Sequence, residues 1–150
     1  MNTELAKTLE AVARFMNAGG HEWVVFGGAA MVMHGYETGA VSDVDILVSA
    51  ETAVWMMKEL TLDNHADGRS TRFRSDYFLH PDFGSIPVEV VANFRILSDG
   101  EWHPVSPTNA TRMRVRGQTV FAMEQVELAK VFDLCGREKD LVRSKMLRPF

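Results

Sequence analysis

The N-terminal third of the chain alternates between helical and extended hydrophobic patterns. Apolar side chains at positions 5, 9, 12, 15 and 16 recur at helical spacing, and Gly19-Gly20 is a typical helix end. Residues 22–26 are a short β-rich run that ends at Gly27-Gly28, after which "AAMVMH" favours a helix closed by Gly35. The pattern therefore predicts a helix, a strand, a tight turn and a second helix.

The middle of the chain favours extended structure with one further helix. "VSDVDILV" (41–48) is expected to be a strand, and "SAETAVWMMKEL" (49–60) a helix with Ser49 as its N-cap. "TRFRSDYFLH" (71–80) and "SIPVEVVANF" (85–94) flank the turn-like "PDFG". These two runs are therefore predicted to pair as an antiparallel hairpin.

The C-terminal third begins with a polar stretch and ends in helical patterns. "SDGEWHPVSPTNA" (98–110) is expected to be a loop, and "TRMRVRGQTVF" (111–121) two short strands about Gly117-Gln118. Two helices are expected over 122–135 and 137–147, separated at Gly136. Together the elements predict a single domain over residues 1–150, of the α/β (α+β) class, with a mixed β-sheet flanked by helices.

Composition narrows the range of partners. With 150 residues, of which 46% are hydrophobic, the chain suits one globular domain. A net charge of −4 argues against binding nucleic acid through a general basic field. Cys135 is the single cysteine and the N-terminus is not a signal-peptide pattern, so we expect a cytoplasmic protein. No apolar stretch approaches the roughly 20 residues that cross a bilayer, so no membrane association is expected.

Two aspartates at the start of an apolar run are the main candidate for chemistry. Alternate residues of a strand share a face, and two such Cα atoms lie roughly 6.6 Å apart, so Asp43 and Asp45 are able to converge on one cation. Carboxylate oxygens are the ligands that Mg²⁺ prefers, and Mg²⁺ commonly completes its coordination with water or substrate phosphate oxygens. The pair therefore predicts a Mg²⁺ or Mn²⁺ site that takes a phosphate substrate.

Gly27 and Gly28 supply the complementary half of such a site. A strand that turns directly into a helix aims free backbone N–H groups at the turn, and anions bind there. A side chain at position 28 would hold a triphosphate away from the backbone. The glycines and the aspartates together predict a site for a nucleoside triphosphate.

These motifs resemble those of a known family. "GGAAMVMHG", followed by "SDVDILV", is similar to the Gly-Gly turn, short helix and Asp-x-Asp strand of the DNA polymerase β-like nucleotidyltransferase superfamily. The likeness is greatest to its minimal bacterial and archaeal members, including abortive-infection toxin-type proteins. The closing "LAKVFDLCGREKDLV" is also similar to the final helices of those proteins.

The resemblance implies further site residues. The family places a third acid on a neighbouring apolar strand, and Glu89 in "PVEVVANF" has that setting. Asp76 stays open as an alternative third acid, because a shift of one or two positions in the hairpin would set it opposite Glu89. The expected catalytic and metal-binding residues are Asp43, Asp45 and Glu89. The expected nucleotide-binding residues are Gly27, Gly28, Ser42 and Lys130.

The expected activity is metal-dependent transfer of a nucleoside monophosphate from an NTP to a hydroxyl-type acceptor on a protein, an RNA or a small molecule, with release of pyrophosphate. A haloacid-dehalogenase-like phosphatase is disfavoured, because the apolar run follows the aspartates instead of preceding them. An EF-hand is disfavoured because its third acid, glycine and distal glutamate are missing. The alternative that stays open is a non-catalytic binding module, such as one half of a toxin–antitoxin pair, with a small helical partner or a second copy of the chain.

Overall fold

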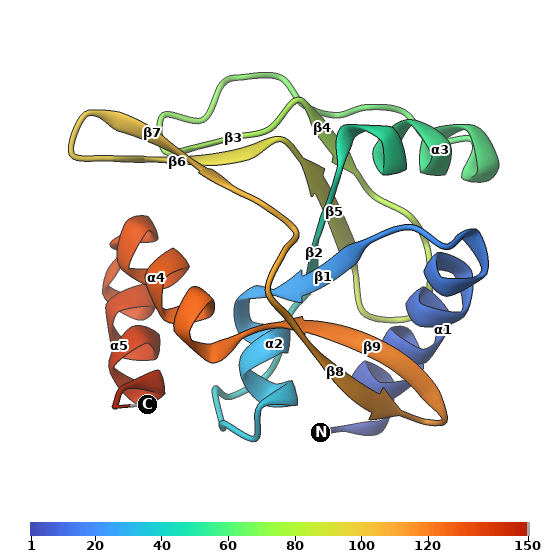
Figure 1. Ribbon diagram of the computed structural model, residues 1–150, viewed down its shortest axis with the longest axis horizontal. Coiled ribbons are helices and arrows are strands. Elements are labelled where there is room, and N and C mark those ends of the chain that lie inside the picture. Colours follow the sequence, from blue (N-terminus) through green and yellow to red (C-terminus); the bar gives the residue numbers. More distant parts are fainter. Residues whose placement is uncertain (150) are drawn as a thin grey trace.

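A computed structural model describes residues 1–149 as five helices and nine strands (Figure 1). In chain order the elements are α1 (Thr3–Gly19), β1 (Trp23–Phe26), α2 (Gly27–Met33), β2 (Val44–Val48), α3 (Ala50–Leu60), β3 (Phe73–Arg74), β4 (Tyr77–Leu79), β5 (Val88–Ala92), β6 (Phe94–Ser98), β7 (Glu101–Val105), β8 (Ala110–Val115), β9 (Gln118–Met123), α4 (Gln125–Cys135) and α5 (Glu138–Leu147). Within this part of the chain no helix has the length and apolar character needed to span a bilayer.

Six strands form the central sheet, in the order β4-β5-β2-β1-β9-β8. β2 runs parallel to β5, and β1 runs parallel to β9, while the other neighbours are antiparallel. The sheet is therefore mixed, and the α+β fold expected from the sequence is confirmed. A second sheet of three short strands, β3-β6-β7, lies apart from it along the top of Figure 1.

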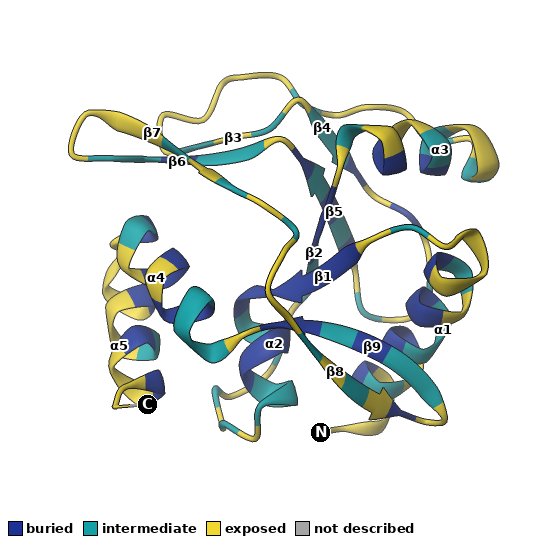
Figure 2. Ribbon diagram, in the orientation of Figure 1, coloured by how far each residue is buried: buried dark blue, intermediate teal, exposed yellow. Residues whose placement is uncertain are grey.

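Helices α1 and α3 lie side by side, because Phe15 of α1 stacks on Trp55 of α3 with ring centroids 4.8 Å apart. Helix α1 packs on β8 and β9, and α3 packs on β4 and β5. Figure 2 shows that buried residues run along the central strands and the inner sides of these helices. In β5, Val88, Val90 and Ala92 are buried, whereas the intervening residues are half-buried on the opposite face.

Local sequence signals set the ends of the helices as expected. The Ser49 side chain accepts a hydrogen bond from the backbone N–H of Thr52, which confirms it as the N-cap of α3. Gly20 and Gly136 end α1 and α4 in the left-handed conformation that favours glycine.

Residues 98–110 are not a loop throughout, which corrects the sequence-based expectation. Glu101–Val105 form β7, which pairs with β6 across a turn at Asp99-Gly100. Both turn residues have positive φ, 50° and 77°, as in a two-residue hairpin turn. An Asp-Gly pair is a strong hairpin signal, but Pro104 and the polar residues of the second strand obscured it.

Two other strand predictions differ in detail. Residues 71–80 divide into β3 and β4, which belong to different sheets, and only β4 forms the predicted hairpin with β5. The chain passes from β5 to β6 at Asn93, whose φ of 52° turns it out of the central sheet. The β8–β9 turn lies at Arg116-Gly117, one residue earlier than predicted.

Candidate active site

Strand register brings three acids together at one edge of a cavity. Asp45 lies opposite Phe26 of β1 on one side and opposite Glu89 of β5 on the other. Asp43 directly precedes β2. One carboxylate oxygen from each of Asp43, Asp45 and Glu89 lies within 4.8 Å of the others. Within residues 1–149, these are the His, Cys, Asp or Glu side chains that come close enough, in a group of three or more, to hold one metal ion.

The acid cluster carries more negative charge than its surroundings neutralise. Burial, as the largest cause, together with the charges of Asp43 and Glu89 and a hydrogen bond with Glu89, raises the pKa of Asp45 from 3.8 to about 8. Arg143 lowers it, but not enough to compensate. Three half-buried carboxylates of this kind are a donor set that fits a hard divalent cation, because such an ion supplies the missing positive charge.

The glycine turn lies directly beside the acids. Gly27 has a φ of +67°, and a Cβ atom built on it would lie 2.7 Å from Asp45 Oδ2. A Cβ on Gly28 would instead meet an Arg143 side-chain nitrogen at 3.4 Å, which is an ordinary contact with a flexible group. Gly27 is therefore needed for the shape of the acid cluster, and Gly28 keeps space open beside a guanidinium group.

Positive charge at this turn comes from α5. Arg143 is half-buried beside Gly28, and Lys139, one turn earlier on the same helix, lines the same cavity. Neither side chain forms an ion pair within residues 1–149. The α2 helix has only seven residues, so these two cations supply more of the local positive potential than its short dipole.

The start of α5 is fixed by a buried ion pair. Asp140 is fully buried and accepts hydrogen bonds from Arg137 Nε at 2.6 Å, from its Nη2 at 3.1 Å and from its backbone N–H at 3.2 Å. Because a buried carboxylate without a partner is strongly unfavourable, the pair stabilises the first turn of α5, which includes Lys139 and belongs to the same helix as Arg143.

The acids, the glycine turn and the α5 cations line one cavity of about 420 Å³. Of the residues expected from the sequence to bind nucleotide, Gly27, Gly28 and Ser42 line this cavity. Lys130 does not: it is exposed on α4 and pairs with Glu127 at 3.3 Å. Sequence reasoning did not single out Lys139 and Arg143, although their spacing of four residues on a predicted helix places them on one face.

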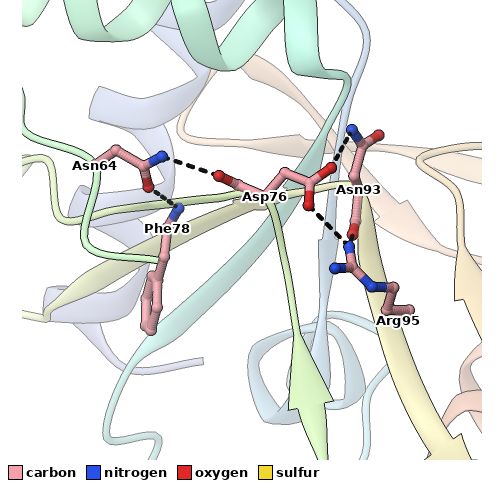
Figure 3. Close-up of polar contacts among 5 residues, drawn as sticks. All are labelled: Asn64, Asp76, Phe78, Asn93 and Arg95. Atoms are coloured by element: carbon pink, nitrogen blue, oxygen red, sulfur yellow. Dashed lines mark hydrogen bonds and ion pairs between the residues drawn. The ribbon is translucent and has the colours of Figure 1, made fainter. Parts of the chain in front are cut away.

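Asp76, the alternative third acid, lies elsewhere. It is exposed, and its carboxylate accepts hydrogen bonds from Asn93 and Arg95, each at 3.0 Å (Figure 3). These contacts lower its pKa. Its backbone N–H bonds to Ala92 O, three residues beyond Glu89, so the hairpin register separates it from the acid cluster. The structure groups Glu89, not Asp76, with the aspartates.

This chain is similar to known proteins in structure and not in sequence. No family model matches the sequence, and no curated protein is significantly similar to it. A structure from Thermotoga maritima, assigned to the nucleotidyltransferases, aligns with 99% of this chain and 92% of its own, with a TM-score of 0.75 and 20% identity. The lincosamide adenylyltransferase LnuA, bound to lincomycin, aligns over 95% of both chains, with a TM-score of 0.60 and 13% identity.

The chain has the nucleotidyltransferase fold. A further structure with this fold is that of ANT(2'')-Ia in complex with adenylyl-2''-tobramycin, with a TM-score of 0.54 and 14% identity over 97% of this chain and 87% of its own. The resemblance stated from the "GGAAMVMHG" and "SDVDILV" motifs is confirmed at the level of the fold. At these identities the likeness shows the fold and leaves activity to be argued from the site.

Substitution of the two glycines is expected to have different effects. Gly27→Ala should lower the stability of the protein by about 1–2 kcal/mol from its positive φ alone, with a further loss from the contact with Asp45. Gly28→Ala should fold at least as well as wild type, because Ala is the better helix former. Urea unfolding of the two variants measures the difference, and equal stability would contradict the assigned role of Gly27.

The pH dependence of stability should reveal the strained carboxylate. Because the folded-state pKa of Asp45 is raised from 3.8 to about 8, the native state holds a proton that the unfolded state has lost, so stability falls as pH rises between these values. In metal-free buffer, Asp45→Asn should flatten this fall and melt at or above the wild-type temperature at pH 8. A difference of 1 kcal/mol shifts the melting temperature of such a domain by roughly 2–4 °C, which calorimetry resolves.

Asp76→Asn is the matched control for this measurement. Its pKa is lowered, so its contribution to stability is present above the unfolded-state pKa and is lost as pH falls. That variant should keep the wild-type decline toward pH 8. A melting temperature of metal-free Asp45→Asn well below that of wild type at pH 8 would instead make Asp45 a stabilising structural residue.

Proposed function

We propose that the protein transfers a nucleoside monophosphate from an NTP to a hydroxyl acceptor, with release of pyrophosphate. The observation that carries the proposal is the position of the acid cluster directly beside the glycine turn, with Arg143 next to the turn and Lys139 on the lining of the same cavity. A cation site and an anion site side by side in one cavity fit a metal-bound polyphosphate.

The phosphate groups bind at the glycine end of the cavity. The open space at Gly28 admits an oxygen close to the backbone, and the Arg143 guanidinium and Lys139 ammonium groups neutralise the β- and γ-phosphates. Ser42, in the loop before Asp43, lies within reach as a hydroxyl donor on the same lining. Asp43, Asp45 and Glu89 would hold Mg²⁺ or Mn²⁺, which supplies positive charge to the oxygens that attack and leave.

In the reaction, the acceptor oxygen forms a bond to the α-phosphorus, and the bond from that phosphorus to the bridging oxygen of the β-phosphate breaks. Glu89 accepts the proton of the attacking hydroxyl. Lys139 and Arg143 stabilise the charge that develops on the departing pyrophosphate. The carboxylates thus act at the α-phosphate and the attacking hydroxyl, and the two cations act at the leaving group.

The central test is isotopic. With Mg²⁺, label at the α-phosphorus should move to an acceptor while γ-label leaves in pyrophosphate, and Asp43→Asn and Asp45→Asn should each reduce transfer by orders of magnitude. Calorimetry should show NTP binding that a chelator abolishes, because carboxylates and phosphates repel without a bridging cation. Transfer of γ-label alone would refute the proposal, and metal-dependent binding without any transfer would favour the non-catalytic binding module.

A second prediction concerns the α5 cations. Lys139→Ala and Arg143→Ala should each weaken Mg-NTP binding by about tenfold or more, since a charge-assisted hydrogen bond contributes roughly 1.5–3 kcal/mol. Lys145→Ala is the matched control, because Lys145 is exposed on the same helix and does not line the cavity. A loss of affinity in Lys130→Ala, with none in Lys139→Ala, would instead support the nucleotide-binding residue expected from the sequence.

A further inference from the structure

The cavity has a second end whose lining differs in character from the first. Beyond Glu89 it is lined by Val91 of β5, Phe78 of β4, Phe73 of β3 and Phe94 of β6. All four side chains are half-buried, in contrast to Val90 and Leu79, which are buried within the core. The rings of Phe73 and Phe94 are stacked, with centroids 6.2 Å apart and planes inclined by 19°. We call these four residues the aromatic end.

Strand register places Val91 and Phe78 of the aromatic end across the acids from the glycine turn. At the level of the acids the order across the sheet is Phe26, Asp45 and Glu89, and Gly27 directly follows Phe26. Val91 lies two residues beyond Glu89 on the same face of β5, and Phe78 of β4 lies opposite Val91. Glu89, Val91 and Phe78 are therefore on the far side of Asp45 from Gly28, whereas Phe94 reaches back to Phe26, with ring centroids 5.6 Å apart.

The chemistry of phosphoryl-type transfer assigns a ligand to that side. Attacking and leaving oxygens lie roughly in line through the phosphorus. If pyrophosphate leaves toward Arg143 and Lys139, the attacking hydroxyl approaches from the side of Glu89. The acceptor body then lies against the aromatic end.

The charges around the aromatic end restrict the acceptor further. Arg137 lies over the Phe73 ring at 5.1 Å, and Arg74, which also lines the cavity, lies over Trp102 at 5.0 Å and has no ion pair within residues 1–149. Asp67 is the acid on this part of the lining, and its carboxylate accepts a hydrogen bond from the backbone N–H of Arg69 and faces the Arg69 side chain. Of the carboxylates on the cavity lining, Asp140 is paired with Arg137 and Asp67 faces Arg69, and the remaining three form the metal cluster.

We propose that the acceptor is a hydroxyl compound with a flat, apolar body and no positive charge, bound at the aromatic end. This inference rests on the proposed function. A polycation at the aromatic end of this chain would bring ammonium groups toward the Arg74 guanidinium group, which has no ion pair within residues 1–149, and such a like-charge arrangement is costly.

The test uses three probes with one ring system and different charges: naphthalene-1-methanol, 1-naphthoate and 1-naphthylmethylammonium. Their binding is measured by calorimetry at saturating Mg²⁺ and α,β-methylene NTP, so that the metal cluster is neutralised and unavailable to the ammonium group. We expect the alcohol and the carboxylate to bind together with the nucleotide. The ammonium probe should bind about tenfold more weakly or not at all.

Two substitutions sharpen the test. Arg74→Glu reverses an exposed charge at the aromatic end and should remove the bias against the ammonium probe, with Arg114→Glu on β8 as the control outside the cavity. Val91→Asp should act in the same direction, with Val54→Asp, exposed on α3, as its control. Thermal melts establish whether each variant is folded. If Val91→Asp does not fold, Arg74→Glu still tests the inference.

The outcomes separate this inference from the proposed function. Tightest binding of the ammonium probe, absence of binding by all three, or an unchanged order in Arg74→Glu would overturn the inference while NTP binding persists. Displacement of the alcohol by the NTP analogue would also overturn it and make the aromatic end the nucleobase site. If no NTP binds but the probes keep the expected order of affinity with Mg²⁺ alone, the proposed transfer reaction is refuted. The preference of the cavity for uncharged or anionic rings is then still supported.

Discussion

The site depends on one unfavourable interaction, the mutual repulsion among the carboxylates of Asp43, Asp45 and Glu89. Strand pairing fixes Asp45 beside Glu89, and Asp43 joins them from the preceding loop, so the groups cannot separate without breaking the sheet. Burial, and after it the charges of Asp43 and Glu89, raises the pKa of Asp45. Folding energy from the buried β-sheet thus maintains an arrangement that the acids alone would not adopt, as is common at functional sites.

The surrounding elements supply positive charge at controlled distances from this cluster. Arg143 lies beside Gly28 and lowers the pKa of Asp45, yet it does not form an ion pair with the aspartate. Arg137 is paired with Asp140 in the first turn of α5, so its charge is already neutralised. A cation that neutralised the cluster directly would compete with metal, so cations that stand back from the acids suit a site that binds both an ion and an anionic ligand.

The parts of the site that the sequence predicted are those whose geometry is local. Asp43 and Asp45 share a face because they are two residues apart, and Gly27-Gly28 marks the turn within one short segment. Glu89 required a resemblance, because choosing it over Asp76 depends on the register of a hairpin, in which Asp76 lies four positions away from the residue opposite Glu89. The α5 cations were not assigned to the site because the packing of that helix beside the glycine turn is a tertiary property, which the sequence of the helix does not show.

The mixed central sheet was predictable from strand and helix patterns, whereas the small sheet was not. β3 has only two residues, too few for any periodicity, and its partner β6 is reached only because Asn93 turns the chain. The aromatic end depends on both strands, so its existence is a tertiary property of the fold.

Gly27 shows that the specification of a site includes an atom that has to be missing. Its left-handed backbone could be adopted by an asparagine, but the space beside it is taken by Asp45 Oδ2, 2.7 Å from where any Cβ would lie. Position 27 is therefore restricted in two independent ways: the turn requires a positive φ, and the carboxylate of Asp45, eighteen positions later in the chain, leaves no space for a Cβ atom. A residue with no side chain is in this sense as much a part of the acid cluster as the acids themselves.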